Sequence, residues 1–199
     1  MKGLLAILLA APALVVGEGF TPLFNGRDLE GWDADTPGLW QARDGMIVGR
    51  HSGLKYNDFL RTRKLYSDFI LKLSFRLVGG IGNSGIQFRT KAAPISHEVS
   101  GYQADIGEKY WGCLYDESRR NKVLAQASPE SLASLQKDGW NEYAITARGN
   151  RIVLELNGVR AVEYSETDSS IERAGIVALQ LHSGPPMEVH FKDIVIEAR

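Results

Sequence analysis

Residues 69–77 read FILKLSFRL, and every odd-numbered residue in this stretch is apolar. Lys72, Ser74 and Arg76 lie between the apolar positions. Because successive side chains of a β-strand point to opposite faces, the alternation predicts a strand with one buried and one exposed face. One-sided strands of this kind are typical of antiparallel sheets, so the stretch favours an all-β fold.

The same alternation recurs along the chain, in residues 84–90, 143–148, 152–156, 177–182 and 189–196. The dipeptide Asn157-Gly158 separates two of these stretches and predicts a hairpin with a type I′ turn. A phase slip near Asp193 indicates a β-bulge. Ser128 and Pro129 predict the start of one short helix, which Gly139 would end. We therefore predict a two-sheet antiparallel sandwich.

The composition is that of an ordinary folded domain, with 199 residues, 44% hydrophobic and 24% charged. Lys and Arg number 23 against 24 Asp and Glu, so the net charge of −1 gives no case for binding nucleic acid. Cys113 is the single cysteine, which excludes an intrachain disulfide and a cysteine-based zinc cluster.

The N-terminus has the pattern of a secretory signal peptide. Lys2 precedes an uncharged apolar run from Leu4 to Val16, and Ala11-Pro12-Ala13 and Val15-Val16-Gly17 each offer a cleavage site. The run is shorter than the roughly 20 residues that span a bilayer. We predict a signal peptide over residues 1–17 and a single exported domain over 18–199, periplasmic or extracellular and not inserted in a membrane. The alternative is a buried N-terminal strand or helix.

Several longer motifs, taken together in their order and spacing, resemble the 3-keto-disaccharide hydrolase family, formerly a domain of unknown function. They are residues 20–32 (FTPLFNGRDLEGW), 83–89 (NSGIQFR), 140–143 (WNEY), 175–182 (GIVALQLH) and 189–194 (VHFKDI). The resemblance implies a jelly-roll sandwich of the concanavalin A-like lectin/glucanase type, export in bacteria, and action on 3-keto-glycosides. The family pattern also has a Tyr-Glu strand, and in the matching stretch 101–107 (GYQADIG) Gln103 stands where a carboxylate is usual.

A ketone at C3 of a sugar acidifies the hydrogen on C2, so a base can form an enolate and the C1 oxygen can then leave. Water adds to the resulting enone. This route needs a base, a group that stabilises charge on the C3 oxygen, and help for the leaving group. Ordinary glycosidases instead use two carboxylates. Glu98 and Asp105 are the nearest approach to such a pair in this sequence.

Three residues are candidates for the chemistry. Arg89 shares a strand face with Gln87 if the alternation continues, and would stabilise the enolate. Asp105 or His182 would transfer the proton. Each has a structural alternative: a salt-bridged Arg89, an Asp105 that caps a turn, and a structural His182. A divalent metal ion held by Asp105 and His182 is a further possibility, with no ligand set assigned.

Six residues are candidates for binding a small saccharide. Gln87 and Gln103 lie on the strands that carry Arg89 and Asp105, and Gln180 is two residues from His182. Three more come from the segment after Gly107: Trp111 and Tyr115 would stack on a sugar ring, and Glu117 would add a polar contact. The alternative is that Trp111 and Tyr115 fill the edge of the sandwich.

The leading hypothesis is an exported jelly roll that cleaves 3-keto-glycosides, with Arg89, Gln103, Asp105 and His182 on its concave face. The second is a non-catalytic carbohydrate-binding module or lectin, which Gln103 favours because an amide replaces the usual carboxylate. The third is a structural module of the cell surface.

Overall fold

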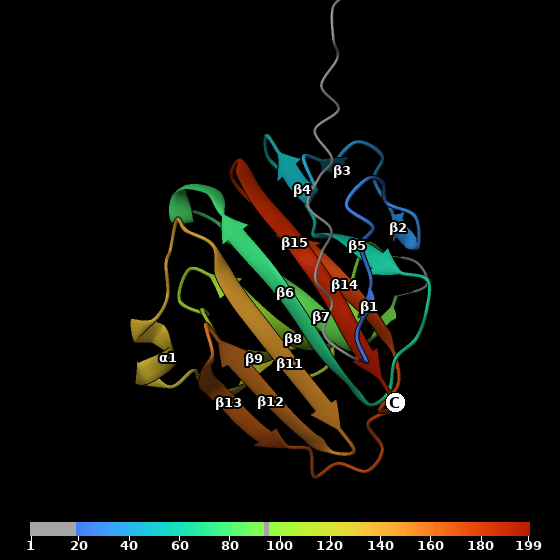
Figure 1. Ribbon diagram of the computed structural model, residues 1–199, viewed down its shortest axis with the longest axis vertical. Coiled ribbons are helices and arrows are strands. Elements are labelled where there is room, and N and C mark those ends of the chain that lie inside the picture. The colour runs from blue at the N-terminus through green and yellow to red at the C-terminus, as the bar shows by residue number, and fades with distance from the viewer. Residues whose placement is uncertain (1–18, 94–95) are drawn as a thin grey trace, which may run out of the picture.

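The computed structural model describes residues 19–93 and 96–199, which form two packed β-sheets (Figure 1). The first, the β6 sheet, has a short strand, β1 (Thr21–Pro22), paired with β15. Its other strands are, in spatial order, β13 (Val159–Ser165), β12 (Arg151–Leu156), β11 (Asn141–Arg148), β6 (Phe69–Leu77), β15 (Met187–Ala198), β4 (Met46–His51) and β3 (Trp40–Arg43).

The second sheet, the β7 sheet, lies behind the first in Figure 1. Its strands are, in spatial order, β10 (Lys122–Ala125), β9 (Leu114–Glu117), β8 (Val99–Gly107), β7 (Asn83–Ala92), β14 (Ile176–Leu181), β5 (Asp58–Thr62) and β2 (Trp32–Ala34). Two short helices complete the described elements, the 3₁₀ helix η1 (Val78–Gly80) and the α-helix α1 (Pro129–Ala133). Every pairing among the described strands is antiparallel, so the predicted all-β sandwich is confirmed.

The core fills the space between the sheets with the apolar residues of the alternating stretches. The odd-numbered residues of β6 are buried, as the opening pattern predicts. Phe69 of β6 meets Phe88 of β7 edge to face, with ring centroids 6.2 Å apart. The residues that alternate with Phe88 therefore point away from the core, onto the outer face of the β7 sheet.

The turn, the bulge and the short helix predicted from the sequence are all present in the structure. Asn157 and Gly158 both have positive φ, as a type I′ turn requires, and the register of β15 shifts around Asp193. Both predictions are confirmed. The helix begins as predicted, because the Ser128 hydroxyl accepts a hydrogen bond from the backbone N–H of Ser131. It ends at Ala133, so the prediction that Gly139 ends it is wrong.

The predicted signal peptide, residues 1–17, lies outside the described residues and stays a prediction, which N-terminal sequencing of the mature protein would check. Among residues 19–93 and 96–199, no helix is long and apolar enough to cross a membrane.

Candidate active site

Four polar side chains form a buried row on the outer face of the β7 sheet. They are Gln87 of β7, Gln103 and Asp105 of β8, and Gln180 of β14, and each is 3% exposed or less. Gln87 pairs with Gln103 in the register, and Asp105 pairs with Gly85. Because buried polar groups are costly outside a network or a ligand site, this row is the natural place to look for function.

A directed chain of hydrogen bonds runs along the row. The Thr90 hydroxyl donates to Gln87 Oε1 (3.0 Å), Gln87 Nε2 donates to Gln103 Oε1 (2.6 Å), and Gln103 Nε2 donates to Asp105 Oδ2 (2.8 Å). Asn83 Nδ2 donates to the other oxygen of Asp105 (3.1 Å). Asp105 accepts amide N–H groups at both of its carboxyl oxygens, and these contacts set the orientation of both glutamine amides.

The Asn83-Ser84-Gly85 motif builds this arrangement, a role that the sequence analysis did not assign. The Asn83 side chain donates to the Asp105 carboxyl group, and the Ser84 hydroxyl donates to the backbone carbonyl of Gln180 (2.7 Å). Gly85 provides room, because a Cβ there would lie 2.5 Å from Cδ of Gln103. Each residue of the motif therefore positions a member of the polar row.

Asp105 combines deep burial with a neutral-range pKa. Burial raises its pKa to about 7, against the opposing hydrogen bonds from Gln103 and Asn83, and the nearby charge of Glu117 adds to the rise. The Tyr143 hydroxyl crosses from the β6 sheet and donates to the Asp105 carbonyl (2.7 Å), which fixes the backbone. A carboxyl that is half-protonated near pH 7 is suited to acid–base catalysis.

Glu117 and Tyr115 of β9 lie beside the row. Tyr115 pairs with Gln103 in the register and is half-buried. Burial and then the charge of Glu98 raise the pKa of Glu117, while His182 and the amide of Gln180 lower it. These effects place Glu117 among Glu98, His182 and Gln180.

Gln180 carries an unused hydrogen-bonding group. Neither its amide nitrogen nor its amide oxygen makes a hydrogen bond within the described part of the chain, although the residue is fully buried. The amide is near enough to Glu117 to lower the pKa of its carboxyl group, but the two groups do not meet the geometry of a hydrogen bond. An unpaired buried amide costs stability, which is expected where a ligand supplies the missing partner.

His182 follows β14 and presents one bare nitrogen. Its Nδ1 lies 2.7 Å from the Ser183 carbonyl oxygen, which can only accept, so Nδ1 carries the proton and Nε2 of the neutral ring keeps its lone pair. Two neighbours hold this turn: His51 Nε2 donates to the His182 carbonyl (3.0 Å), and Asn57 Oδ1 accepts from the Ser183 N–H (2.9 Å). The His182 ring is thus available as a proton acceptor.

Asn57 and Glu98 border the same face. Asn57 had no role in the sequence prediction, and Glu98 entered it only as the carboxylate nearest to pairing with Asp105. Glu98 makes long contacts of 3.4–3.5 Å to Asn57 on one side and to the Ser118 hydroxyl on the other. Both residues belong to connections between strands, and the single signal for Glu98 was its carboxylate. It therefore lies across the outer face, from the β5 side to the β9 side.

Arg89 does not join the cluster, and the prediction that it shares the face of Gln87 is wrong. A bulge interrupts β7 after Phe88, and Arg89 has a φ of 46°. Its guanidinium donates to the carbonyls of Ser67 and Gly149 and to Asp68 (2.7–2.8 Å), reaching the end of the β6 sheet. The structural alternative, a salt-bridged arginine, describes this position.

Trp111 also lies apart from the polar row. It is 8% exposed and belongs to the main core. This agrees with the alternative that Trp111 fills the edge of the sandwich. The divalent-metal prediction gains no geometric support, because the described residues contain no group of three or more His, Cys, Asp or Glu placed to hold a metal ion.

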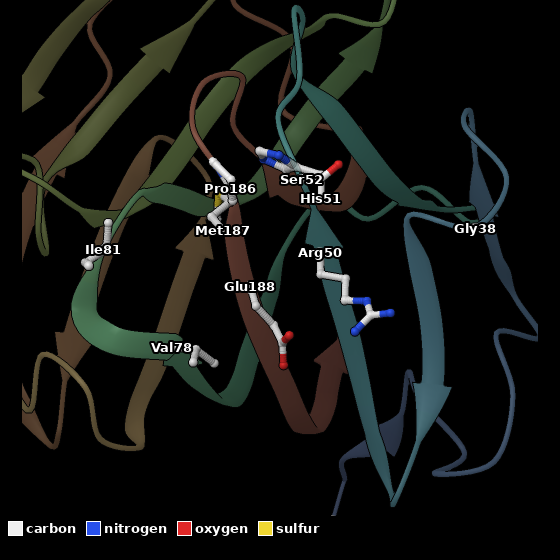
Figure 2. Close-up of a pocket in the computed structure, with 9 residues that line it drawn as sticks. All are labelled: Gly38, Arg50, His51, Ser52, Val78, Ile81, Pro186, Met187 and Glu188. Carbon is white, nitrogen blue, oxygen red and sulfur yellow. The ribbon is translucent and has the colours of Figure 1, made fainter.

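A hollow of about 600 Å³ lies elsewhere on the molecule, beside strands β4 and β15 (Figure 2). Figure 2 shows Arg50 and Glu188 side by side on the neighbouring strands β4 and β15. The residues that line the hollow are Gly38, Arg50, His51, Ser52, Val78, Ile81, Pro186, Met187 and Glu188. None of the predicted site residues lines this hollow. We therefore take the outer face of the β7 sheet as the candidate active site.

The sequence profile of the 3-keto-alpha-glucoside-1,2-lyase-like domain matches residues 19–197, nearly the whole described chain. The chain belongs to this family. The resemblance drawn from the motifs is confirmed, and the protein is carbohydrate-related. A comparison with curated proteins gave no match.

Solved structures similar to this family member share its fold. A glycosyl hydrolase-like protein from Parabacteroides distasonis ATCC 8503 superposes with a TM-score of 0.71 at 20% identity, covering 94% of this chain and 99% of its own. The carbohydrate-binding module CBM66 from Bacillus subtilis gives 0.65 at 17% identity, covering 84% and 96%. The Bacillus licheniformis β-glucanase gives 0.60 at 11% identity, covering 85% and 93%. At these identities the likeness confirms the predicted jelly-roll fold and nothing further.

Proposed function

We propose that this protein cleaves 3-keto-glycosides by elimination followed by hydration. The observation that carries the proposal is the buried, unpartnered amide of Gln180, which lies beside groups able to transfer protons. Membership of the 3-keto-alpha-glucoside-1,2-lyase-like family supports the substrate class. The ligand is a small neutral saccharide, in keeping with the lack of a strong net charge.

In the first half-reaction, Nε2 of His182 takes the proton from C2 of the sugar. The electron pair of that C–H bond forms the enolate, whose charge on the C3 oxygen is stabilised by the free N–H groups of Gln180. The enolate then expels the C1 oxygen. Protonated Asp105 gives its proton to this leaving oxygen, which leaves an enone and an Asp105 carboxylate.

In the second half-reaction, water adds to C1 of the enone. Asp105 takes back a proton from the water, and protonated His182 returns its proton to C2. Both groups end in the state in which they began, so the cycle closes without a further reactant. Gln180 takes the charge-stabilising role that the sequence analysis gave to Arg89.

Incubating the purified protein with 3-keto-trehalose tests the proposal, and release of 3-keto-glucose is the expected result. Assays with and without EDTA prevent a metal requirement from being mistaken for inactivity. Unmodified trehalose is the control, because a two-carboxylate glycosidase needs no ketone. Equal cleavage of both sugars would point to Asp105 and Glu117 as an ordinary carboxylate pair and would overturn the elimination route.

The second candidate function is saccharide binding without cleavage. The amide at Gln103, in place of the family's usual carboxylate, favours it, because the row then holds one acid fewer for catalysis. Tight binding of 3-keto-trehalose with no product under any metal condition would establish this function instead.

Replacing Gln180 with Leu is expected to raise stability and to lower turnover. Leu has a similar volume and removes a buried amide without partners, so the free energy of unfolding should rise by about 1 kcal/mol. Turnover of 3-keto-trehalose should fall about 10-fold or more, because the enolate loses its donor. Denaturant melts and initial rates on the same preparation measure both. A variant that is more stable and fully active would show that Gln180 is only a packing defect.

A further inference from the structure

Two dipeptides from distant parts of the chain meet at the rim of the candidate site. The rings of Tyr56 and His97 are stacked, with centroids 4.0 Å apart and planes 10° from parallel. Their chain neighbours Asn57 and Glu98 are also in contact, at 3.4 Å. Each aromatic residue is therefore followed directly by a polar residue that borders the outer face.

A small second core anchors this junction. Phe59, Val99 and Ala178 are fully buried in a cluster separate from the main core. Phe59 lies two residues after Asn57, and Val99 follows Glu98 directly. The cluster therefore holds the segment after Tyr56 and the segment after His97 against each other.

Tyr56 remains 42% exposed in spite of this anchoring. One face of its ring lies against His97, which restricts the ring orientation, and the exposed part of the ring faces solvent. A large aromatic ring that is held in place but left uncovered is suited to receive a ligand, because little conformational entropy is lost on binding.

We propose that Tyr56, backed by His97, is the stacking platform for a pyranose ring at the entrance of the site. This inference rests on the proposed function. A pyranose with mainly equatorial hydroxyls presents a face of C–H groups, which binds an aromatic face, while Asn57 and Glu98 offer hydrogen bonds to its hydroxyl edge. The platform would thus select gluco-configured sugars over those with axial hydroxyls on the stacking face.

The test is the dissociation constant for 3-keto-trehalose, measured by calorimetry in the His182→Ala background so that the sugar is not consumed. We expect binding to weaken about 10-fold for Tyr56→Ala and to change less than about 2-fold for Tyr56→Phe, which keeps the ring. His97→Ala should weaken binding about 3-fold, because Tyr56 loses its support. Since Tyr56 is exposed at the surface, circular dichroism should show unchanged folding.

Ile81→Ala is the matched control, because Ile81 is 68% exposed and lines the hollow in Figure 2. Unchanged binding in this variant is expected. A full effect of Ile81→Ala with none of Tyr56→Ala would move the sugar to that hollow and overturn the platform. Normal binding in Tyr56→Ala would overturn the platform alone, whereas a wild-type protein that neither binds nor cleaves the sugar would overturn the proposed function with it.

Discussion

Turnover of 3-keto-trehalose is expected to fall about 100-fold or more when His182 is replaced by Ala, because the reaction loses the base that takes the C2 proton. The structure supports this role through the tautomer: Nδ1 is committed to the Ser183 carbonyl, which leaves Nε2 as an acceptor. Initial rates at saturating substrate measure the effect. Exchange of the C2 hydrogen with deuterated water, followed by NMR, should stop in the same variant.

His190→Ala is the matched control for His182→Ala. His190 pairs with Glu188 on β15 of the β6 sheet, outside the candidate site, so its loss should leave turnover unchanged. Added imidazole should restore part of the rate to His182→Ala if the missing ring is a base and not a structural support. A normal rate in His182→Ala, with folding intact, would remove His182 from the mechanism.

The alternation of the strands predicts the outward orientation of the polar row from the sequence alone. Gln87, Gln103, Asp105 and Gln180 each alternate with core residues, so a period of two turns each of them away from the core. This inference needs no knowledge of distant contacts. It therefore succeeds wherever the strand is regular.

Arg89 shows where the same inference fails. A single extra residue in β7 reverses the face of every side chain after it, and the bulge has no glycine or proline to announce it. The positive φ falls on Arg89 itself. Its hydrogen bonds to Ser67, Asp68 and Gly149 hold the chain in that conformation, and these partners become neighbours only when the two sheets pack.

The contacts at the rim of the site could not be predicted from the sequence for a related reason. Tyr56 and Asn57 meet His97 and Glu98 across about 40 residues of chain. No periodicity relates such segments, because they lie in connections whose course depends on tertiary packing. The Asn-Ser-Gly motif was visible in the sequence, yet its purpose is clear only from the positions of Asp105, Gln180 and Gln103 beside it.

Replacing Asp105 with Asn is expected to lower turnover of 3-keto-trehalose about 100-fold, because the leaving oxygen loses its proton donor. A substrate with a nitrophenol leaving group needs no such donor, so its turnover should fall much less. Comparing the two substrates separates loss of an acid from general damage to the site. An equal loss on both would show that Asp105 positions the polar row and does not transfer a proton.

The pH profiles give a second and independent reading of Asp105. Its pKa of about 7 lies above the value of 3.8 expected for an unfolded chain, so the wild-type protein should lose activity as the pH rises through 7 and the acid gives up its proton. The Asn variant should lack this limb.

By linkage, a raised folded-state pKa stabilises the protein below the unfolded pKa, and that contribution is lost as the pH rises toward 7. The unfolding free energy of Asp105→Asn should therefore improve relative to wild type between pH 4 and pH 8, as denaturant melts at both pH values would measure. If the relative stability of the two proteins did not change with pH, Asp105 would not be the group with the shifted pKa. A loss of activity at high pH would then belong to another residue, and Glu117 would be the first to test.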